Sequence, residues 1–409
     1  MNKFFVFIYL ILATHLSSGQ DYFKISGRVL DNETKQPLYF ASICIAGNRI
    51  GTVSNINGNF LLKIPNRFKE DTLYISFMGF TPRKILLTEI HDFYIEVALE
   101  PMYFHVKEVV IRSFSPKEII KQAIAKIPEN YPEFPVNFLA FYREDIRENG
   151  KYIQFIEAVL GIYKGSYNNK KDNDCLKIIK GRQKLDVIES LIWDYIKFIN
   201  GPYEMIRSDV AKYPTNFITV AQSKINFLNE KHFKYYDYQL LRKKRKENDD
   251  IYVIEFKPKK IPKKALFEGY ICIDRKTLAF TSLNYTFSAN RINKAKIISP
   301  YTENQLNEID VYIKAIDFFN IVKFKPYGGK WYLSNSKMEY HFLFIEKNQN
   351  YLSHITNVID FVVTDIDSSN VQTFKKKNYI KMRQSLTEQL GEFDEEFWGN
   401  YNFIKENKF

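Results

Sequence analysis

The stretch Gly51-Thr52-Val53-Ser54-Asn55-Ile56-Asn57-Gly58-Asn59-Phe60 lies at the centre of the most regular part of the chain. On both sides of it, between residues 21 and 112, apolar residues recur at every second position. The alternating positions are Ile25, Gly27 and Val29; Ala41, Ile43 and Ile45; Phe60, Leu62 and Ile64; Leu73, Ile75 and Phe77; and Ile95, Val97 and Leu99. Short alternating runs separated by turn residues, with no helical period between them, predict an antiparallel sandwich. Asn57-Gly58 predicts a hairpin, because both residues tolerate positive φ.

Five motifs keep their order and spacing through this region. They are Ile25-Ser26-Gly27-Arg28-Val29, Pro37-Leu38 with Ala41-Ser42-Ile43, the stretch from Gly51 to Phe60, the run from Leu73 to Phe80, and Lys107-Glu108-Val109-Val110-Ile111. Together they resemble the carboxypeptidase-regulatory-like domain, in the form common in envelope proteins of Bacteroidetes. There the domain precedes TonB-dependent transporter barrels or other β-rich modules. The resemblance implies a seven-stranded, transthyretin-like sandwich that carries no catalytic residues.

The first residues have the pattern of a secretory signal peptide. Lys3 supplies a positive charge, Phe4 to Ala13 is an uninterrupted apolar run, and Ser17-Ser18-Gly19 offers small residues before Gln20. The apolar run is shorter than the ~20 residues that a spanning helix needs. We therefore expect a signal peptide at residues 1–19 and an exported protein, periplasmic or associated with the outer membrane. No later stretch predicts a transmembrane helix.

Composition and charge limit the classes of partner. Aromatic residues make up 16% of 409 residues, which favours strands, and the formal net charge is +12. The dense basic run consists of the consecutive residues Arg242, Lys243, Lys244, Arg245 and Lys246. Such a run is usually a solvated turn between strands, and its alternative role is contact with an anionic surface. An exported protein is not expected to bind nucleic acid.

After the first domain the period changes. Ser115-Pro116-Lys117-Glu118 is a helix start, with Ser as N-cap and Pro at the first helical position. We expect a sandwich over residues 20–112, a linker helix within 113–134, a β-rich domain of unknown function over 135–374 and a tail over 375–409. Long runs of strand pattern in the third region predict a curved antiparallel sheet or half-barrel with one or two helices, the first at 186–199 and a second near 203–211. The fold class is therefore mainly β.

Two features of the later chain have competing interpretations. Residues 252–256, 267–274 and 277–280 resemble, over a short span, lipoprotein-carrier half-barrels of the LolA type. The tail contains Phe393, Phe397 and Trp398 among four acidic residues. These aromatic residues either dock on the second domain or are offered to a partner.

The sequence contains no complete catalytic constellation. His105-Val106-Lys107-Glu108 matches half of a zinc-peptidase pattern, with His232 as a third ligand, but strand alternation in the last strand of the sandwich would separate these side chains. His341 and His354 lie on adjacent predicted strands and are expected to form a structural pair. Asp365-Ile366-Asp367 lacks the remainder of a Ca²⁺ loop. We therefore expect no catalytic, cofactor-binding or metal residues.

These observations lead to a non-enzymatic envelope protein that binds or docks a protein partner or an apolar ligand. The alternative is a periplasmic carrier or chaperone for lipid or lipoprotein, and a zinc-dependent peptidase is the remote alternative. The sequence leaves open the ligand, the oligomeric state and whether the second domain encloses a pocket.

Overall fold

The structure is a computed structural model, and it describes residues 22–92, 94–102, 104–105, 115–169, 172–185, 201–214, 225–243, 251–260, 265–295, 300–380, 386–392, 398 and 401–405. The expected signal peptide and the expected helix at 186–199 lie outside these residues. Within them, no helix is both long enough and apolar enough to cross a bilayer.

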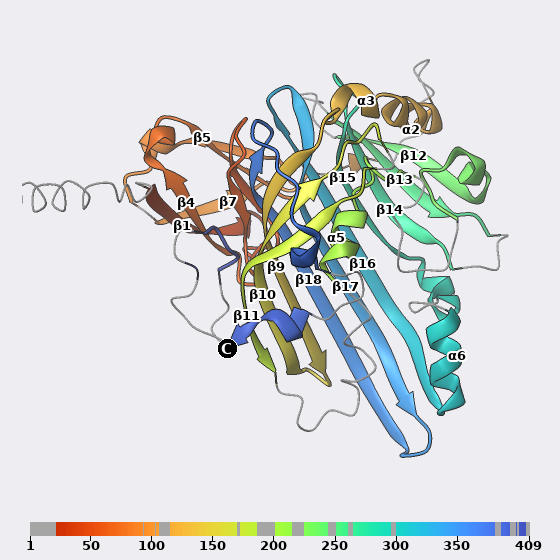
Figure 1. Cartoon of the computed structure of the whole chain (residues 1–409). Coiled ribbons are helices and arrows are strands. Elements are labelled where there is room, and N and C mark those ends of the chain that lie inside the picture. Colours follow the sequence, from red (N-terminus) through yellow and green to blue (C-terminus); the bar gives the residue numbers. More distant parts are fainter. Residues whose placement is uncertain are drawn as a thin grey trace, which may run out of the picture.

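The N-terminal domain is a sandwich of two small sheets, with seven strands among the described residues, as the resemblance implied (Figure 1). One sheet has the order β4 (Asn59–Pro65), β1 (Tyr22–Asp31) and β7 (Tyr94–Leu99), and the other has the order β3 (Gly51–Val53), β2 (Ser42–Ile45), β5 (Thr72–Ser76) and β6 (Arg83–Leu86). The alternating apolar residues point between the sheets, and most are fully buried, for example Val29, Ile43 and Leu62. One detail differs from the expectation, because β1 and β7 pair in parallel.

The turn at Asn57-Gly58 is present, but it is not a hairpin. Gly58 has φ +76°, and its N–H donates to Asn55 O at 2.8 Å. β3 pairs with β2, whereas β4 pairs with β1 in the other sheet. The turn therefore carries the chain from one sheet to the other. Turn chemistry specifies a reversal of the chain but not the strand with which the next segment pairs.

A helical connection follows, in two pieces: α2 (Pro116–Ala125) and α3 (Ile127–Asn130). The Ser115 side chain accepts the N–H of Glu118 at 3.3 Å, so the predicted N-cap is confirmed. Further helices are α5 (Pro202–Arg207), where the second helix was expected, and α6 (Pro300–Glu308). Short 3-10 helices lie at Asn66–Phe68, Leu87–Glu89, Glu230–Tyr235, Ala289–Lys294, Lys376–Asn378 and Leu386–Gln389.

The second domain is organised around one large curved sheet (Figure 1). In spatial order its strands are β19 (Gly391–Glu392), β11 (Cys175–Leu185), β10 (Lys151–Lys164), β9 (Val136–Glu148), β18 (Tyr351–Asp367), β17 (Lys330–Glu346), β16 (Val311–Tyr327), β15 (Phe280–Phe287), β14 (Phe267–Asp274), β13 (Ile251–Pro258), β12 (Tyr236–Lys243) and β8 (Phe104–His105). From β11 to β12 every neighbouring pair is antiparallel. Among the described strands, the two ends of the sheet do not pair, so the sheet is open.

β8 corrects one expectation. It pairs with β12 at the edge of the large sheet, through Arg242 opposite His105 and Lys243 opposite Phe104. His105 therefore lies outside the sandwich, in whose last strand it was expected. The backbone of β8 pairs with the edge strand β12, whose residues lie more than 130 positions later in the chain, so the sequence around His105 does not indicate this pairing.

The two faces of the large sheet are covered differently. One, the helix-covered face, packs against α2, α3, α5 and residues 225–235 in a single apolar core that includes Ile120, Met205 and Phe227. The other, the sandwich-covered face, contacts the N-terminal domain and residues 398 and 401–405, which we call the C-terminal segment. There Phe40 and Val53 of the sandwich share a smaller core with the sheet and with Trp398 and Ile404. This second contact forms the candidate site.

Candidate functional site

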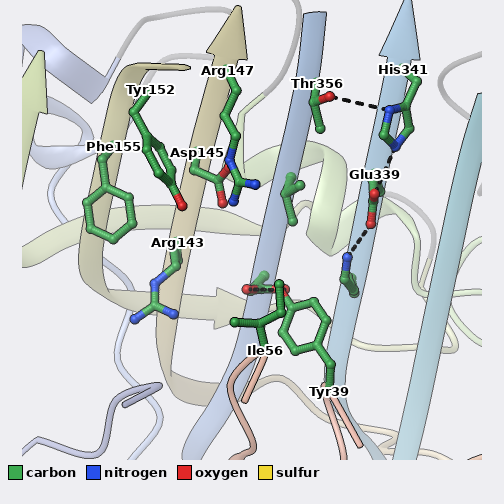
Figure 2. A pocket seen from close by; sticks show the side chains of 13 residues that line it. Tyr39, Ile56, Arg143, Asp145, Arg147, Tyr152, Phe155, Glu339, His341 and Thr356 are labelled. Atoms are coloured by element: carbon green, nitrogen blue, oxygen red, sulfur yellow. Dashed lines mark hydrogen bonds and ion pairs between the residues drawn. The ribbon is translucent and has the colours of Figure 1, made fainter. Parts of the chain in front are cut away.

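A cleft opens where the sandwich meets the large sheet, and we call it the polar cleft (Figure 2). Its volume is about 320 Å³. Tyr39 and Ile56 reach into it from the sandwich. The sheet contributes Arg143, Asp145 and Arg147 from β9, Tyr152 and Phe155 from β10, Lys337, Glu339 and His341 from β17, and Thr356, Val358 and Asp360 from β18. The cleft is thus built by both domains.

The strand registers explain why so many polar side chains meet here. Successive side chains of a strand point to opposite faces, so every second residue of β9, β17 and β18 lies on the sandwich-covered face. Directly paired residues then form rows across the strands. The first row, which we call the charged row, contains Arg182, Glu157, Arg143, Asp360 and Lys337. The second row contains Phe155, Asp145, Val358 and Glu339, and the third contains Tyr152, Arg147, Thr356 and His341.

The charged row alternates in sign and is deeply buried, with no member more than 5% exposed. Glu157 lies between two arginines: its Oε1 accepts from Arg143 Nε at 2.8 Å, and its Oε2 accepts from Arg182 Nε at 2.9 Å. Burying charges costs free energy unless they are paired and hydrogen-bonded, and here each carboxylate faces cations on both sides. The row therefore fixes the register of four strand pairs while keeping its charges internal.

Asp145 and Arg147 form the least satisfied pair in the cleft. Arg147 Nε and Asp145 Oδ1 form an ion pair at 2.9 Å, and neither side chain has a hydrogen bond to another described residue. Burial raises the pKa of the Asp145 carboxyl to about 6, against the lowering effect of Arg147. A carboxylate has about four acceptor sites and a guanidinium has five N–H donors, so this pair has capacity for a further partner.

A hydrogen-bonded chain lines the opposite wall (Figure 2). Lys337 Nζ donates to Glu339 Oε2 at 2.5 Å, and His341 Nε2 lies 2.8 Å from Glu339 Oε1. Thr356 Oγ1 lies 3.3 Å from the other ring nitrogen, Nδ1, of His341. The hydrogen bond from His341 and the positive charge of Lys337 lower the pKa of Glu339 to about 2, despite its partial burial. Glu339 is therefore ionised throughout the physiological range.

The sandwich is attached to this face by polar contacts as well as by packing. Tyr39 directs its hydroxyl at both carboxylate oxygens of Asp360, at 3.1 and 2.9 Å. The pKa of Asp360 is raised by burial. Arg49 Nε pairs with Asp365 Oδ1 at 3.0 Å. Tyr39, which lines the polar cleft from the sandwich, thus already has its hydrogen-bond partner.

The C-terminal segment occupies the seam between the two domains. Ile404 O accepts from Arg143 of the sheet at 2.6 Å, while Phe403 O accepts from Thr52 of the sandwich at 3.2 Å. Asn402 exchanges two hydrogen bonds with the backbone of Lys63, at 2.8 and 3.2 Å. The segment therefore bonds to both domains and stabilises their contact.

The aromatic tail motif is only partly described. Trp398 is 3% exposed and packs edge-on against Phe141 of β9, with ring centroids 5.3 Å apart. The interpretation that this residue docks on the second domain is confirmed. Phe393 and Phe397 lie outside the described residues.

The other residues singled out in the sequence have structural contacts. His341 and His354 are near neighbours across β17 and β18, with ring centroids 5.7 Å apart and planes tilted by 36°. His232 accepts the N–H of Asn226 through Nδ1, at 3.0 Å. Asp367 accepts two backbone N–H groups in a local turn. Within the described part of the chain, no group of His, Cys, Asp and Glu side chains is arranged to hold a metal ion.

The basic run lies at the border of what the structure describes. Arg242 and Lys243 form the end of β12, and residues 244–246 lie outside the described residues. Contact of this run with an anionic surface stays a prediction.

Sequence reasoning missed the cleft. The signal was present in Arg143, Asp145 and Arg147, because charged residues at every second position within a long strand indicate a polar face. Which other charges stand opposite them depends on pairings between segments as distant as Arg143 and Asp360. Local pattern does not contain that information.

Comparison with known families places two regions of the chain. Residues 25–111 match the model of the CarboxypepD_reg-like domain, and residues 204–321 match that of a family of unknown function, DUF5686. No curated protein matches the chain.

Several solved structures share a distant likeness with the chain. A DUF1329 family protein from Desulfovibrio piger is 12% identical, with a TM-score of 0.25, and the match covers 64% of this chain and 99% of that one. A LolA superfamily protein from Nitrosomonas europaea is 10% identical, with a TM-score of 0.22, covering 66% and 99% respectively. Such low TM-scores carry no argument about this chain. The family matches identify two parts of the chain. Residues 25–111 form a CarboxypepD_reg-like domain, and this domain is joined to a β-rich domain that contains a DUF5686 region.

Proposed function

We propose that this chain is a non-enzymatic binding protein of the cell envelope and that its ligand docks in the polar cleft. The observation that carries the proposal is the composite construction of the cleft, to which both domains contribute side chains. Binding sites commonly form where domains meet. Asp145 and Arg147 line the cleft and form hydrogen bonds to no described residue besides each other, so their remaining carboxylate and guanidinium groups give such a ligand groups to bind.

The arrangement of charges supports binding over catalysis. Arg143 is engaged by Glu157, Lys337 by Glu339, and Asp360 by Tyr39. A nucleophilic site needs a nucleophile held by a base that a third group orients. In the cleft, Thr356, His341 and Glu339 form a chain of hydroxyl, imidazole and carboxylate at 3.3 and 2.8 Å, which matches such an arrangement in outline, so the preference for binding rests on the paired charges alone. We assign these groups to shaping and recognition.

The location in the envelope is part of the proposal. It is supported by the signal-peptide pattern of residues 1–19 and by the domain at residues 25–111, a type common in envelope proteins. Export would place the cleft in contact with periplasmic or surface components.

A thermal-shift screen tests the proposal. The full chain would be heated with three classes of probe: saccharides, dipeptides and single-chain lipids. A ligand at a hundred times its Kd stabilises the native state by about 2.7 kcal/mol, so a binding class raises Tm by an observable amount. The shift should be lost in Asp145→Asn and kept in Glu230→Gln, a matched change at an exposed position. Absence of any shift, or conversion of the probe into a product detected by mass spectrometry, would contradict the proposal.

A lipid carrier is the second candidate, and the aromatic lining of the helix-covered face favours it. Phe227 stacks on Phe256 with centroids 4.0 Å apart, and Tyr285 and Phe318 continue the aromatic cluster. The chain's own segments cover this face, because α5 and residues 225–235 belong to the same core. A lipid would have to displace them.

Native mass spectrometry separates the two candidates. A carrier should co-purify with lipid that adds a discrete mass to the protein. A protein mass free of lipid, together with ligand binding that depends on Asp145, supports the polar cleft as the functional site.

A further inference from the structure

We propose that the polar cleft recognises a saccharide unit, an inference that rests on the proposed binding function and names its ligand class. Three properties of the cleft lead to it: an internal balance of charge, a carboxylate–guanidinium pair with remaining hydrogen-bonding capacity, and apolar walls beside a polar floor.

The first property is the charge balance. Three cations, Arg143, Arg147 and Lys337, and three carboxylates, Asp145, Glu339 and Asp360, line the cleft. Each of these cations is close to a carboxylate, so their fields largely cancel. A charged ligand of either sign would be attracted by the oppositely charged side chains and repelled by those of its own sign. The cleft therefore favours a ligand without net charge.

The second property is hydrogen-bonding capacity. Asp145 and Arg147 line the cleft and pair with each other through Oδ1 and Nε at 2.9 Å, and neither side chain has a hydrogen bond to another described residue, which leaves the second carboxylate oxygen and the terminal guanidinium N–H groups for a ligand. Figure 2 shows both side chains on the cleft side of β9. Thr356 on the neighbouring strand adds a hydroxyl. A ligand hydroxyl both donates and accepts, so neighbouring hydroxyls can satisfy an adjacent carboxylate and guanidinium together.

The third property is the wall on each side. Tyr152 and Phe155 stand on β10, and Ile56 projects from the sandwich, 47% exposed (Figure 2). The guanidinium of Arg147 lies 4.5 Å from the centre of the Tyr152 ring, which holds both groups in place. A sugar ring has apolar C–H faces and a hydroxylated edge. Its faces can pack against the apolar walls of the cleft while its hydroxyls bond to the polar floor.

Size and polarity argue against the other ligand classes. A volume of about 320 Å³ is near the lower end of the range for small-molecule sites, roughly 300–1,000 Å³, and suits a short saccharide. An acyl chain in this cleft would remove water from charged groups without replacing their hydrogen bonds, which is unfavourable. A zwitterion such as a dipeptide carries both signs of charge and is the strongest competitor, so the test includes it.

Saturation-transfer difference NMR on the full chain tests the inference. The probes are glucose, galactose, mannose, N-acetylglucosamine and glycylglycine. We expect at least one of the sugars to bind, with ring protons showing the strongest transfer because they face the apolar walls. Asp145→Asn should weaken that binding about tenfold or more, since a charge-assisted hydrogen bond is lost. Ile56→Ala, an exposed position whose change leaves the core intact, should weaken it less, and Glu230→Gln should leave it unchanged.

The outcomes separate this inference from the proposal on which it rests. Binding of glycylglycine alone, lost in Asp145→Asn, would overturn the saccharide inference and leave the cleft as a binding site. Equal sugar binding by wild type and Asp145→Asn would place the sugar elsewhere and overturn the inference. If no probe binds and the thermal-shift screen is also silent, both fail.

Discussion

At the scale of single residues, Glu157 decides how the large sheet tolerates buried charge. It is 0% exposed and accepts hydrogen bonds from two arginines on the neighbouring strands. Without it, the two buried guanidinium groups would face each other across β10 with no carboxylate between them. Glu157 therefore pairs with Arg143 and Arg182 together.

Replacing Glu157 tests this role. Glu157→Gln leaves Arg143 and Arg182 facing a neutral amide, and breaking a buried ion pair costs about 3–5 kcal/mol. We expect the free energy of unfolding, measured by urea denaturation, to fall by about that amount. Glu230→Gln removes an exposed ion pair with Lys121 and should cost less than about 1 kcal/mol. Similar losses for both variants would contradict the stabilising role of the charged row.

Asp145 predicts a pH dependence of stability. Burial raises the pKa of its carboxyl in the folded chain to about 6, above the ordinary value of 3.8. Between these values the folded chain holds the proton that the unfolded chain releases, so this group lowers the free energy of unfolding as pH rises from about 4 to about 6. The ionised form is kept at a cost to stability, as expected of a group that serves binding.

Asp145→Asn removes this ionisation. Two pKa units correspond to about 3 kcal/mol, so between about pH 4 and pH 7 the stability of the variant relative to wild type should rise by up to that amount. Urea denaturation of both proteins at the two pH values measures the difference. Stability curves that stay parallel across this range would show that Asp145 does not titrate as proposed.

At the scale of elements, the C-terminal segment connects parts of the chain that are far apart in sequence. It bonds to Thr52 and Lys63 of the sandwich and to Arg143 of the sheet. Trp398 lies in the same small core as Phe40 and Phe141. We infer that this segment makes the two domains unfold together.

Trp398→Ala should weaken that coupling. Truncating a buried aromatic side chain costs about 3–5 kcal/mol, here at the contact between the domains. We expect one transition for wild type in scanning calorimetry and two for the variant, as the sandwich and the sheet separate. The matched control is Leu352→Ala, because Leu352 is 63% exposed and contributes little to packing. A single, merely shifted transition in Trp398→Ala would contradict the coupling.

The elements also show what sequence patterns could predict. Alternation found β1, β2, β4, β5 and β7 of the sandwich and the long strands β16, β17 and β18, because one face of each strand carries recurring apolar residues. It gave no strand at β11, where Lys177, Lys180 and Lys184 obscure the period. It placed His105 in the wrong sheet, since the edge with which β8 pairs belongs to a distant segment. Local chemistry specifies strands and turns, whereas partner strands follow from the whole fold.

At the scale of the whole molecule, the candidate site exists only because two domains meet. Tyr39 and Ile56 come from the sandwich, and the other lining residues come from four strands of the large sheet. The alternation of apolar residues predicts the β-rich character of each domain separately. Their contact depends on surfaces that become defined only after both have folded, so the cleft was not predictable from the sequence.

Hydrogen–deuterium exchange can locate the ligand on the whole molecule. The full chain would be compared with and without the probe that most raises Tm. If the ligand docks in the polar cleft, added protection is confined to residues 143–147, 337–341 and 356–360 of the sheet and to residues 54–58 of the sandwich. Protection concentrated instead at α5 and residues 225–235, on the helix-covered face, would contradict binding in the cleft.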